Sequence, residues 1–208
     1  MTKGRLEAFS DGVFAIAITL LVLDLKVPGA HPEGGLWAAL GRQWPSFLAY
    51  LVSFLVIGII WVNHHAVFER VRAVDRAVLF VNLALLLFVS VIPFPTRLLA
   101  EHLTGEAGDA QAAAAIYSAS MLAMGLSYGT LWLVVTRDAG ILHAHLDRAA
   151  QRAAIVRFGF GNVVYLATVG LAFLSPLATL FAHGVIALYY CFDQLRAGAT
   201  RGASDPAG

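Results

Sequence analysis

The sequence predicts an all-α membrane protein with six transmembrane helices. Hydrophobic residues make up 59% of the chain and charged residues 13%, with a mean hydropathy of +0.75. A soluble domain carries roughly 25% charged residues. Six apolar runs have about the length that a membrane-spanning helix needs, and they are continuous rather than alternating, which favours helices over a barrel. The predicted segments are residues 6–25, 47–61, 77–99, 112–135, 153–174 and 177–192.

The first segment lies within the stretch RLEAFSDGVFAIAITLLVLD, residues 5–24. Its uncharged run, 12–23, has 12 residues, a helix of only about 18 Å against a hydrocarbon core of roughly 30 Å. In one interpretation the helix starts late and Asp11 lies at the interface, favoured by the helix dipole. In the other the helix starts near Arg5 and buries Ser10 and Asp11 against other helices, since a carboxylate in the membrane normally faces a bundle interior. The candidate partners are then Arg5, His64 and His65.

The remaining segments have clear boundaries. Trp44-Pro45 precedes the second segment, Pro93 and Pro95 interrupt the third, and a single Ser-Pro pair separates the fifth from the sixth. This spacing predicts a tight helical hairpin at the end of the chain. We expect one six-helix transmembrane domain over 1–195, followed by a disordered cytoplasmic tail over 196–208.

Basic residues are unequally divided between the two sides of this arrangement. Eleven of the 14 lysines and arginines fall on the side of the termini, and three fall on the other side. The positive-inside rule then predicts that both termini are cytoplasmic in a multi-pass protein of the cell inner (plasma) membrane, in agreement with an even helix count. The three on the other side are Lys26, Arg42 and Arg97.

Several classes of function are disfavoured by the sequence. A net charge of +1 argues against nucleic-acid binding, and the lone cysteine, Cys191, excludes an internal disulfide. Phosphate loops, nucleophile elbows, zinc-protease motifs and carbonyl-lined potassium filters are all absent, so no enzyme activity and no cofactor is expected. Adjacent His64 and His65 point about 100° apart on a helix and cannot both chelate one ion, so no metal site is expected.

An apolar stripe runs along the outer half of the first segment. Ile16, Leu20 and Leu23 share one helical face, with Thr19 on its edge. Periodicity alone does not distinguish a pore-lining stripe from a lipid-facing one.

At this point the sequence resembles a known family. The first-helix signature is similar to that of the transmembrane protein 175 family, the endosomal and lysosomal potassium channels, in its prokaryotic branch. The residues that carry the resemblance are Arg5, FSD at 9–11, GVFAIAITLLVL at 12–23, WVNHH at 61–65 and PFP at 93–95.

The resemblance implies a homotetramer in which the first helix of each subunit surrounds a central pore. The principal constriction would fall on Ile16, the next layer on Thr19 or Leu20, and the last on Leu23. The implied partners are further copies of the chain, the lipid bilayer and permeant monovalent cations, with K⁺ as the conducted ion. A hydrogen-bond network would hold the pore helix in place, with one of the two histidines taking part; its candidates are Arg5, Phe9, Ser10, Asp11, Trp61, Asn63, His64 and His65.

Two functions from different classes remain open. The first is passive conduction of K⁺ with modest selectivity over Na⁺, because rings of isoleucine and leucine gate by dewetting and offer no carbonyl ligands. The second is a proton-coupled transporter or proton-conducting channel that uses Asp11 with His64 or His65. The sequence shows no inverted repeat of the kind found in transporters.

A third class, a membrane-embedded metal enzyme, would need the histidine pairs at 64–65 and at 143 and 145. Asp24 would either raise the local cation concentration or be a solvated surface charge.

Overall fold

The computed structural model describes residues 2–137, 141–142 and 148–202. These residues form helices joined by short connections, and no strand occurs among them, so the all-α prediction is confirmed. The elements are α1 (Lys3–Leu21), η1 (Val22–Asp24), α2 (Gly35–Arg42), α3 (Trp44–Glu69), α4 (Arg76–Val91), α5 (Pro93–His102), α6 (Ala107–Thr136), α7 (Arg148–Ala172) and α8 (Pro176–Gly202).

Four stretches of the described chain are long and apolar enough to cross a membrane. They are Lys3–Asp24, Trp44–Glu69, Arg76–His102 and Ala107–Thr136. Two shorter apolar helices, Gly159–Ala172 and Pro176–Tyr190, follow. The chain is therefore a multi-pass membrane protein.

The first helix begins at Lys3, before both of its acidic residues. Of the two interpretations of this segment, the early start is the one that the structure shows. The α-helix ends at Leu21 and one 3-10 turn continues it to Asp24. The whole element therefore has 22 residues, a rise of roughly 33 Å, which is enough for the hydrocarbon core.

The third segment is divided at its prolines. Pro93 has no N–H to donate, so the ladder of hydrogen bonds breaks between α4 and α5. The Val89 carbonyl, to which the N–H of residue 93 would donate in an unbroken helix, accepts instead from the Ile92 N–H at 3.2 Å. The two helices still form one apolar stretch from Arg76 to His102.

The short helix α2 is absent from the sequence-based expectations. Gly34, which precedes it, and Gly35, its first residue, have φ of 74° and 84°, in the left-handed region where glycine costs least. Eight residues are too few for a reliable periodic signal. At the other end of the chain, α8 continues through 196–202, part of the expected tail, and residues 203–208 lie outside the described residues.

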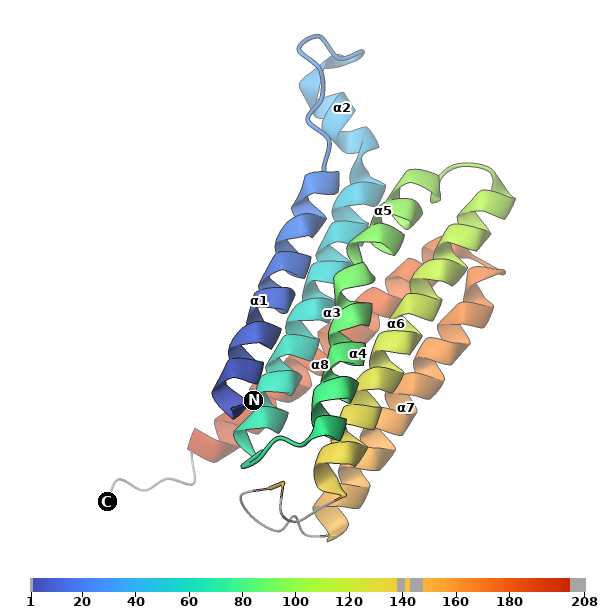
Figure 1. Ribbon diagram of the computed structural model, residues 1–208. Coiled ribbons are helices and arrows are strands. Elements are labelled where there is room, and N and C mark those ends of the chain that lie inside the picture. The colour runs from blue at the N-terminus through green and yellow to red at the C-terminus, as the bar shows by residue number, and fades with distance from the viewer. Residues whose placement is uncertain (1, 138–140, 143–147, 203–208) are drawn as a thin grey trace.

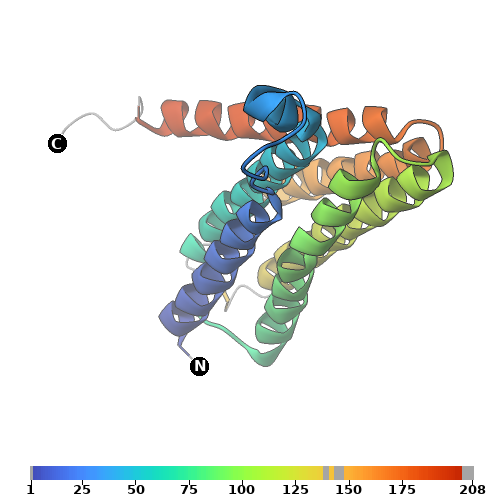
Figure 2. The same ribbon diagram turned by 90° about the horizontal axis from the view of Figure 1, so that it is seen from above.

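The long helices run beside one another, and α8 crosses behind them at an oblique angle (Figures 1 and 2). The first helix packs on α3, α4 and α5, while α8 packs on α3, α6 and α7. The start of α1 and the end of α8 lie at one end of the molecule in Figure 1, and α2 lies at the other end. This arrangement leaves α1 at the edge of the bundle, packed on one side only.

Candidate functional site

Helix α1 has a packed face and an open face. The packed face carries Leu6, Ser10, Phe14, Ala17 and Leu21, all buried. On the open face Ile16 is 61% exposed, Leu20 42% and Leu23 73%, and Thr19 is exposed beside them. The four side chains expected to line a pore thus point away from the rest of the chain.

Thr19 brings a hydroxyl to this apolar face. Its Oγ1 lies 2.9 Å from the carbonyl oxygens of Ala15 and Ile16, so its proton is donated to its own helix. The hydroxyl oxygen keeps lone pairs on the exposed side, because a donating hydroxyl is still an acceptor. The open face therefore combines large apolar side chains with one exposed hydroxyl oxygen.

Asp11 is joined to α3 by a single hydrogen bond. The Trp61 indole Nε1 donates to Asp11 Oδ1 at 2.8 Å. Both side chains are exposed rather than buried within the chain. The expectation that Asp11 is buried against neighbouring helices is therefore wrong within one chain, although its hydrogen bond to Trp61 is present.

A second, buried set of polar groups joins α1, α3 and α4. His64 Nε2 lies 2.8 Å from Asn82 Oδ1, Asn82 Nδ2 donates to Ser10 Oγ at 3.0 Å, and Ser10 Oγ donates to the Leu6 carbonyl at 2.9 Å. All three side chains are buried. Because the Ser10 proton is used on Leu6 and the amide oxygen of Asn82 accepts, His64 must donate from Nε2.

The sequence-based reasoning missed Asn82. An amide in an apolar segment is the signal that could have revealed it, because a polar group there needs a partner from another helix. Its position in the middle of α4 brings it opposite Ser10 of α1, 72 residues away in the chain.

The two adjacent histidines have different environments. His64 is buried, with its ring 5.4 Å from that of Phe14 and 4.5 Å from that of Phe68. His65 is exposed and lies 3.6 Å from Glu69, with its ring stacked on that of Trp61 at 6.4 Å. The histidine that contacts the buried polar groups of α1 and α4 is therefore His64.

The other candidates for the network lie apart from these two clusters. Arg5 is exposed and has no hydrogen-bond or ion-pair partner among the described residues. Phe9 is exposed as well. The side-chain amide of Asn63 donates from Nδ2 to the Ile59 carbonyl. The backbone carbonyl of Asn63 accepts from the Tyr128 hydroxyl at 3.0 Å. Within one chain the expected network is thus two separate clusters.

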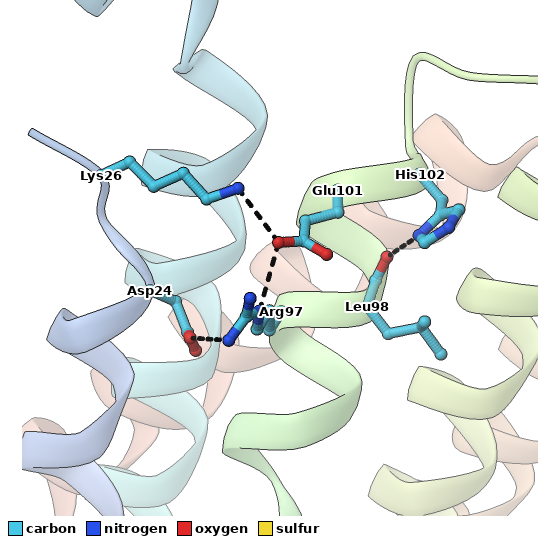
Figure 3. Close-up of polar contacts among 6 residues, drawn as sticks. All are labelled: Asp24, Lys26, Arg97, Leu98, Glu101 and His102. Carbon is cyan, nitrogen blue, oxygen red and sulfur yellow. Dashed lines mark hydrogen bonds and ion pairs between the residues drawn. The ribbon is translucent and has the colours of Figure 1, made fainter. Parts of the chain in front are cut away.

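Ion pairs fasten the other end of the first helix to α5 (Figure 3). Arg97 Nη1 lies 3.9 Å from Asp24 Oδ1, and Arg97 Nε donates to Glu101 Oε1 at 3.2 Å. Lys26 Nζ donates to the same Glu101 oxygen at 3.2 Å. Asp24 is therefore a paired carboxylate next to Leu23, neither a freely solvated charge nor an isolated cation attractor.

The described residues include no group of three or more histidine, cysteine, aspartate or glutamate side chains placed to hold a metal ion. Residues 143 and 145, the second histidine pair considered from the sequence, lie outside the described residues. The described side chains form an apolar helix face that polar contacts with neighbouring helices hold in place.

Comparison with known proteins decides the family. A potassium channel from Streptomyces collinus is 54% identical to this chain over 204 residues, covering 98% of each protein. The chain belongs to the TMEM175 family. The profile of that family, described as the endosomal/lysosomal potassium channel TMEM175, matches residues 5–93, which include most of α1 and all of α3 and α4. This description makes the family one of ion channels, which are not enzymes.

Two further TMEM175 proteins are similar to this chain. The crystal structure of a lysosomal potassium-selective channel TMEM175 homologue from Chamaesiphon minutus has a TM-score of 0.82 and 40% identity, covering 92% of this chain and 97% of that one. The human endosomal/lysosomal proton channel TMEM175 is 44% identical over 101 residues, 45% of this chain and 20% of the human protein. The matched TMEM175 region, 5–93, contains the open face of α1 and both of its polar clusters.

Proposed function

We propose that this protein is a potassium-permeable cation channel whose pore is lined by the open face of α1 from four copies of the chain. The observation that carries the proposal is the two-sided character of α1: one face is packed in the chain, while Ile16, Leu20 and Leu23 project from the other. The similarity to proteins named as potassium channels supports K⁺ as the conducted ion.

Each copy would cross the membrane six times. The four long apolar stretches and the two shorter helices supply the six crossings. The start of α1, the α3–α4 connection and the end of α6 lie at the same end of the molecule, which we propose is cytoplasmic in the plasma membrane (Figure 1). This end is rich in basic residues, as the positive-inside rule requires; they include Lys3, Arg5, Arg70, Arg72, Arg76 and Arg137.

Four α1 helices around an axis would place rings of apolar side chains across the ion path. We expect Ile16 to form the main constriction, with Thr19 or Leu20 and then Leu23 beyond it. A ring of this kind controls conduction by dewetting, since an ion that crosses it must give up water without gaining carbonyl ligands. The Thr19 oxygens offer limited compensation, so selectivity for K⁺ over Na⁺ should be modest.

The test is K⁺ flux through purified protein in liposomes. Ile16→Asn should raise the flux or relax the selectivity, because a polar side chain wets the constriction. Leu166→Asn is the matched control, since Leu166 is similarly exposed, at 60%, but lies on α7. If Ile16→Asn behaves as Leu166→Asn does, the assignment of Ile16 to the pore is wrong.

A proton pathway is the second candidate, and one observation favours it. His64 is a buried titratable group in hydrogen-bonded contact with Asn82 and, through it, with the pore helix. Proton-coupled transport would require a proton gradient for K⁺ flux and would saturate with substrate, whereas a passive channel would do neither. A proton-conducting channel would acidify liposomes, and His64→Gln, which retains a donor toward Asn82, would abolish that acidification.

A further inference from the structure

A cavity lies between α3, α6, α7 and α8, on the part of the chain that does not contain the open face of α1. Its volume is about 50 Å³, and it is open to the space outside the helices. Val56, Ile59 and Ile60 of α3 form an apolar wall, and Asn162 and Tyr165 of α7 are polar residues in its lining.

Among the residues that the structure describes, no hydrogen bond joins the polar groups of these two α7 side chains to another side chain or to the backbone. Tyr165 is only 7% exposed, and its hydroxyl makes no hydrogen bond to any described residue. The side-chain amide of Asn162, which is half-buried, likewise makes none within the described ranges. Neither polar group is sealed within the protein, since both residues line a cavity that opens outward. A ligand in the cavity with a hydrogen-bonding group would therefore find a partner in each.

Glycines give the cavity its shape. A Cβ atom at Gly125 of α6 would lie 2.5 Å from Asn162 Oδ1, and one at Gly161 of α7 would lie 2.7 Å from the Tyr190 hydroxyl. Both distances are too short for real contacts, so an alanine at either position would displace a polar lining group. The space in front of Asn162 therefore depends on the absence of a side chain at Gly125.

The lining determines the chemistry of an occupant. It contains no aspartate, glutamate, lysine or arginine, so it offers no opposite charge to a charged ligand and favours a neutral one. Neighbouring exposed residues on α7, Val163 and Leu166, are apolar and suit an alkyl chain. The volume of about 50 Å³ is roughly a third of a 150 Å³ cavity that binds benzene, so it can hold a hydroxyl group and the first carbons of a chain.

We propose that this cavity binds the hydroxyl end of a neutral alkyl alcohol, with Tyr165 and Asn162 as its hydrogen-bond partners. The alkyl chain lies along the apolar surface of α7. The ligand is either a small soluble alcohol or a membrane lipid with a free hydroxyl, such as a diacylglycerol. The site uses no residue of the open face of α1, so it stands independently of the proposed function.

The experiment is photolabelling of the full chain in phosphatidylcholine nanodiscs with an octanol that carries a diazirine, followed by peptide mapping. We expect the label on residues that line the cavity, and at least about a fivefold loss of it in Gly125→Ala. Gly129→Ala is the matched control on the same helix, since its Cβ would make an ordinary 3.6 Å contact with Asn162 Nδ2. Label spread over the lipid-facing surface, or equal labelling of the two variants, would overturn the proposal.

Tyr165→Phe gives a second test that does not depend on a steric change. The Tyr165 hydroxyl has no hydrogen bond to described residues, so the variant should fold normally. Its affinity for octanol should fall about fivefold, because one hydrogen bond typically contributes about that much to binding. Unchanged affinity would contradict the proposal. Unlabelled octanol and dioctanoylglycerol are then tested as competitors of the photolabel. If only octanol competes, the ligand is a small alcohol, and if dioctanoylglycerol competes as well, the ligand is a lipid. If neither competes, the site is refuted.

Discussion

The buried side chains Ser10, His64 and Asn82 come from three different helices and satisfy one another's hydrogen-bonding groups. Each has a definite role as donor or acceptor because the Ser10 proton is used on the Leu6 carbonyl. Such a chain holds α1 in one rotational setting. That setting determines which residues of α1 are left on its open face.

Asn82→Ala should destabilise the protein by about 1–3 kcal/mol, because it leaves the buried Nε2–H of His64 without an acceptor. Thermal unfolding in detergent measures the change. Ser90→Ala on the same helix is the control, since the exposed Ser90 hydroxyl donates only to the Leu87 carbonyl of its own helix. Equal stability of the two variants would show that the buried chain contributes little.

Asp11→Ala should reduce assembly more than selectivity, because Asp11 positions α1 through Trp61 and does not belong to the expected constriction. We expect the same of Arg5→Ala. Asp11→Asn should be milder, since an amide oxygen still accepts from the indole. The measurements are size-exclusion chromatography for assembly and K⁺/Na⁺ flux ratios for selectivity. Intact assemblies with altered selectivity would contradict this positioning role.

At the scale of elements, the two ends of the first membrane segment are secured differently. Near its start, α1 is held by hydrogen bonds to α3 and α4. At its other end, Asp24 of η1 and Lys26 beyond it are held by ion pairs to α5. Exposed ion pairs contribute little to stability, roughly 0–1 kcal/mol each. Their main effect is therefore geometric: they set where Leu23 lies.

Helix α4 starts at a cap that is sensitive to pH. Asp75 Oδ1 accepts from the Val78 backbone N–H at 2.8 Å, and this bond, followed by the contact with Arg137, holds the pKa of Asp75 below its ordinary value. A carboxyl group whose pKa is lower in the folded protein stabilises the fold at pH values above its pKa in the unfolded chain, about 3.9. This stabilisation is lost as the pH falls through the pKa of the folded protein. The stability difference between wild type and Asp75→Ala should therefore be present at neutral pH and diminish below about pH 4, in thermal unfolding across pH.

At the scale of the whole molecule, four copies around an axis would bring the α1 open faces together. In a Cys191→Ser background, Ile16→Cys should form disulfide-linked dimers on oxidation, while Leu166→Cys on α7 should not. Non-reducing gel electrophoresis of membranes measures this. Crosslinking at Leu166 instead of Ile16 would place a different face of the chain at the centre of the assembly.

The order of helices could be predicted from the sequence because continuous apolar runs leave little choice of structure in a membrane. The boundaries of the helices were harder to predict from the sequence. The short helix α2 depends on two glycines with positive φ, and the division of the third segment depends on Pro93. Both are local effects that a count of apolar residues does not register.

The candidate site was only partly predictable. The periodicity of Ile16, Leu20 and Leu23 placed them on one face but did not say whether another part of the chain covers that face. The choice between His64 and His65 was also open, because adjacent residues of a helix point in different directions and only the packing of α4 shows which one meets a partner. Asn82 was missed for the same reason.

By itself the sequence determined the membrane class, the all-α fold and the family, since these follow from composition, continuous apolar runs and a recognisable first-helix signature. Only the tertiary structure decided which face of α1 is packed, which histidine is buried and which groups pair with Asp11 and Asp24. These depend on contacts between residues far apart in the chain, whose hydrogen bonds and side-chain packing fix the rotation of each helix about its own axis.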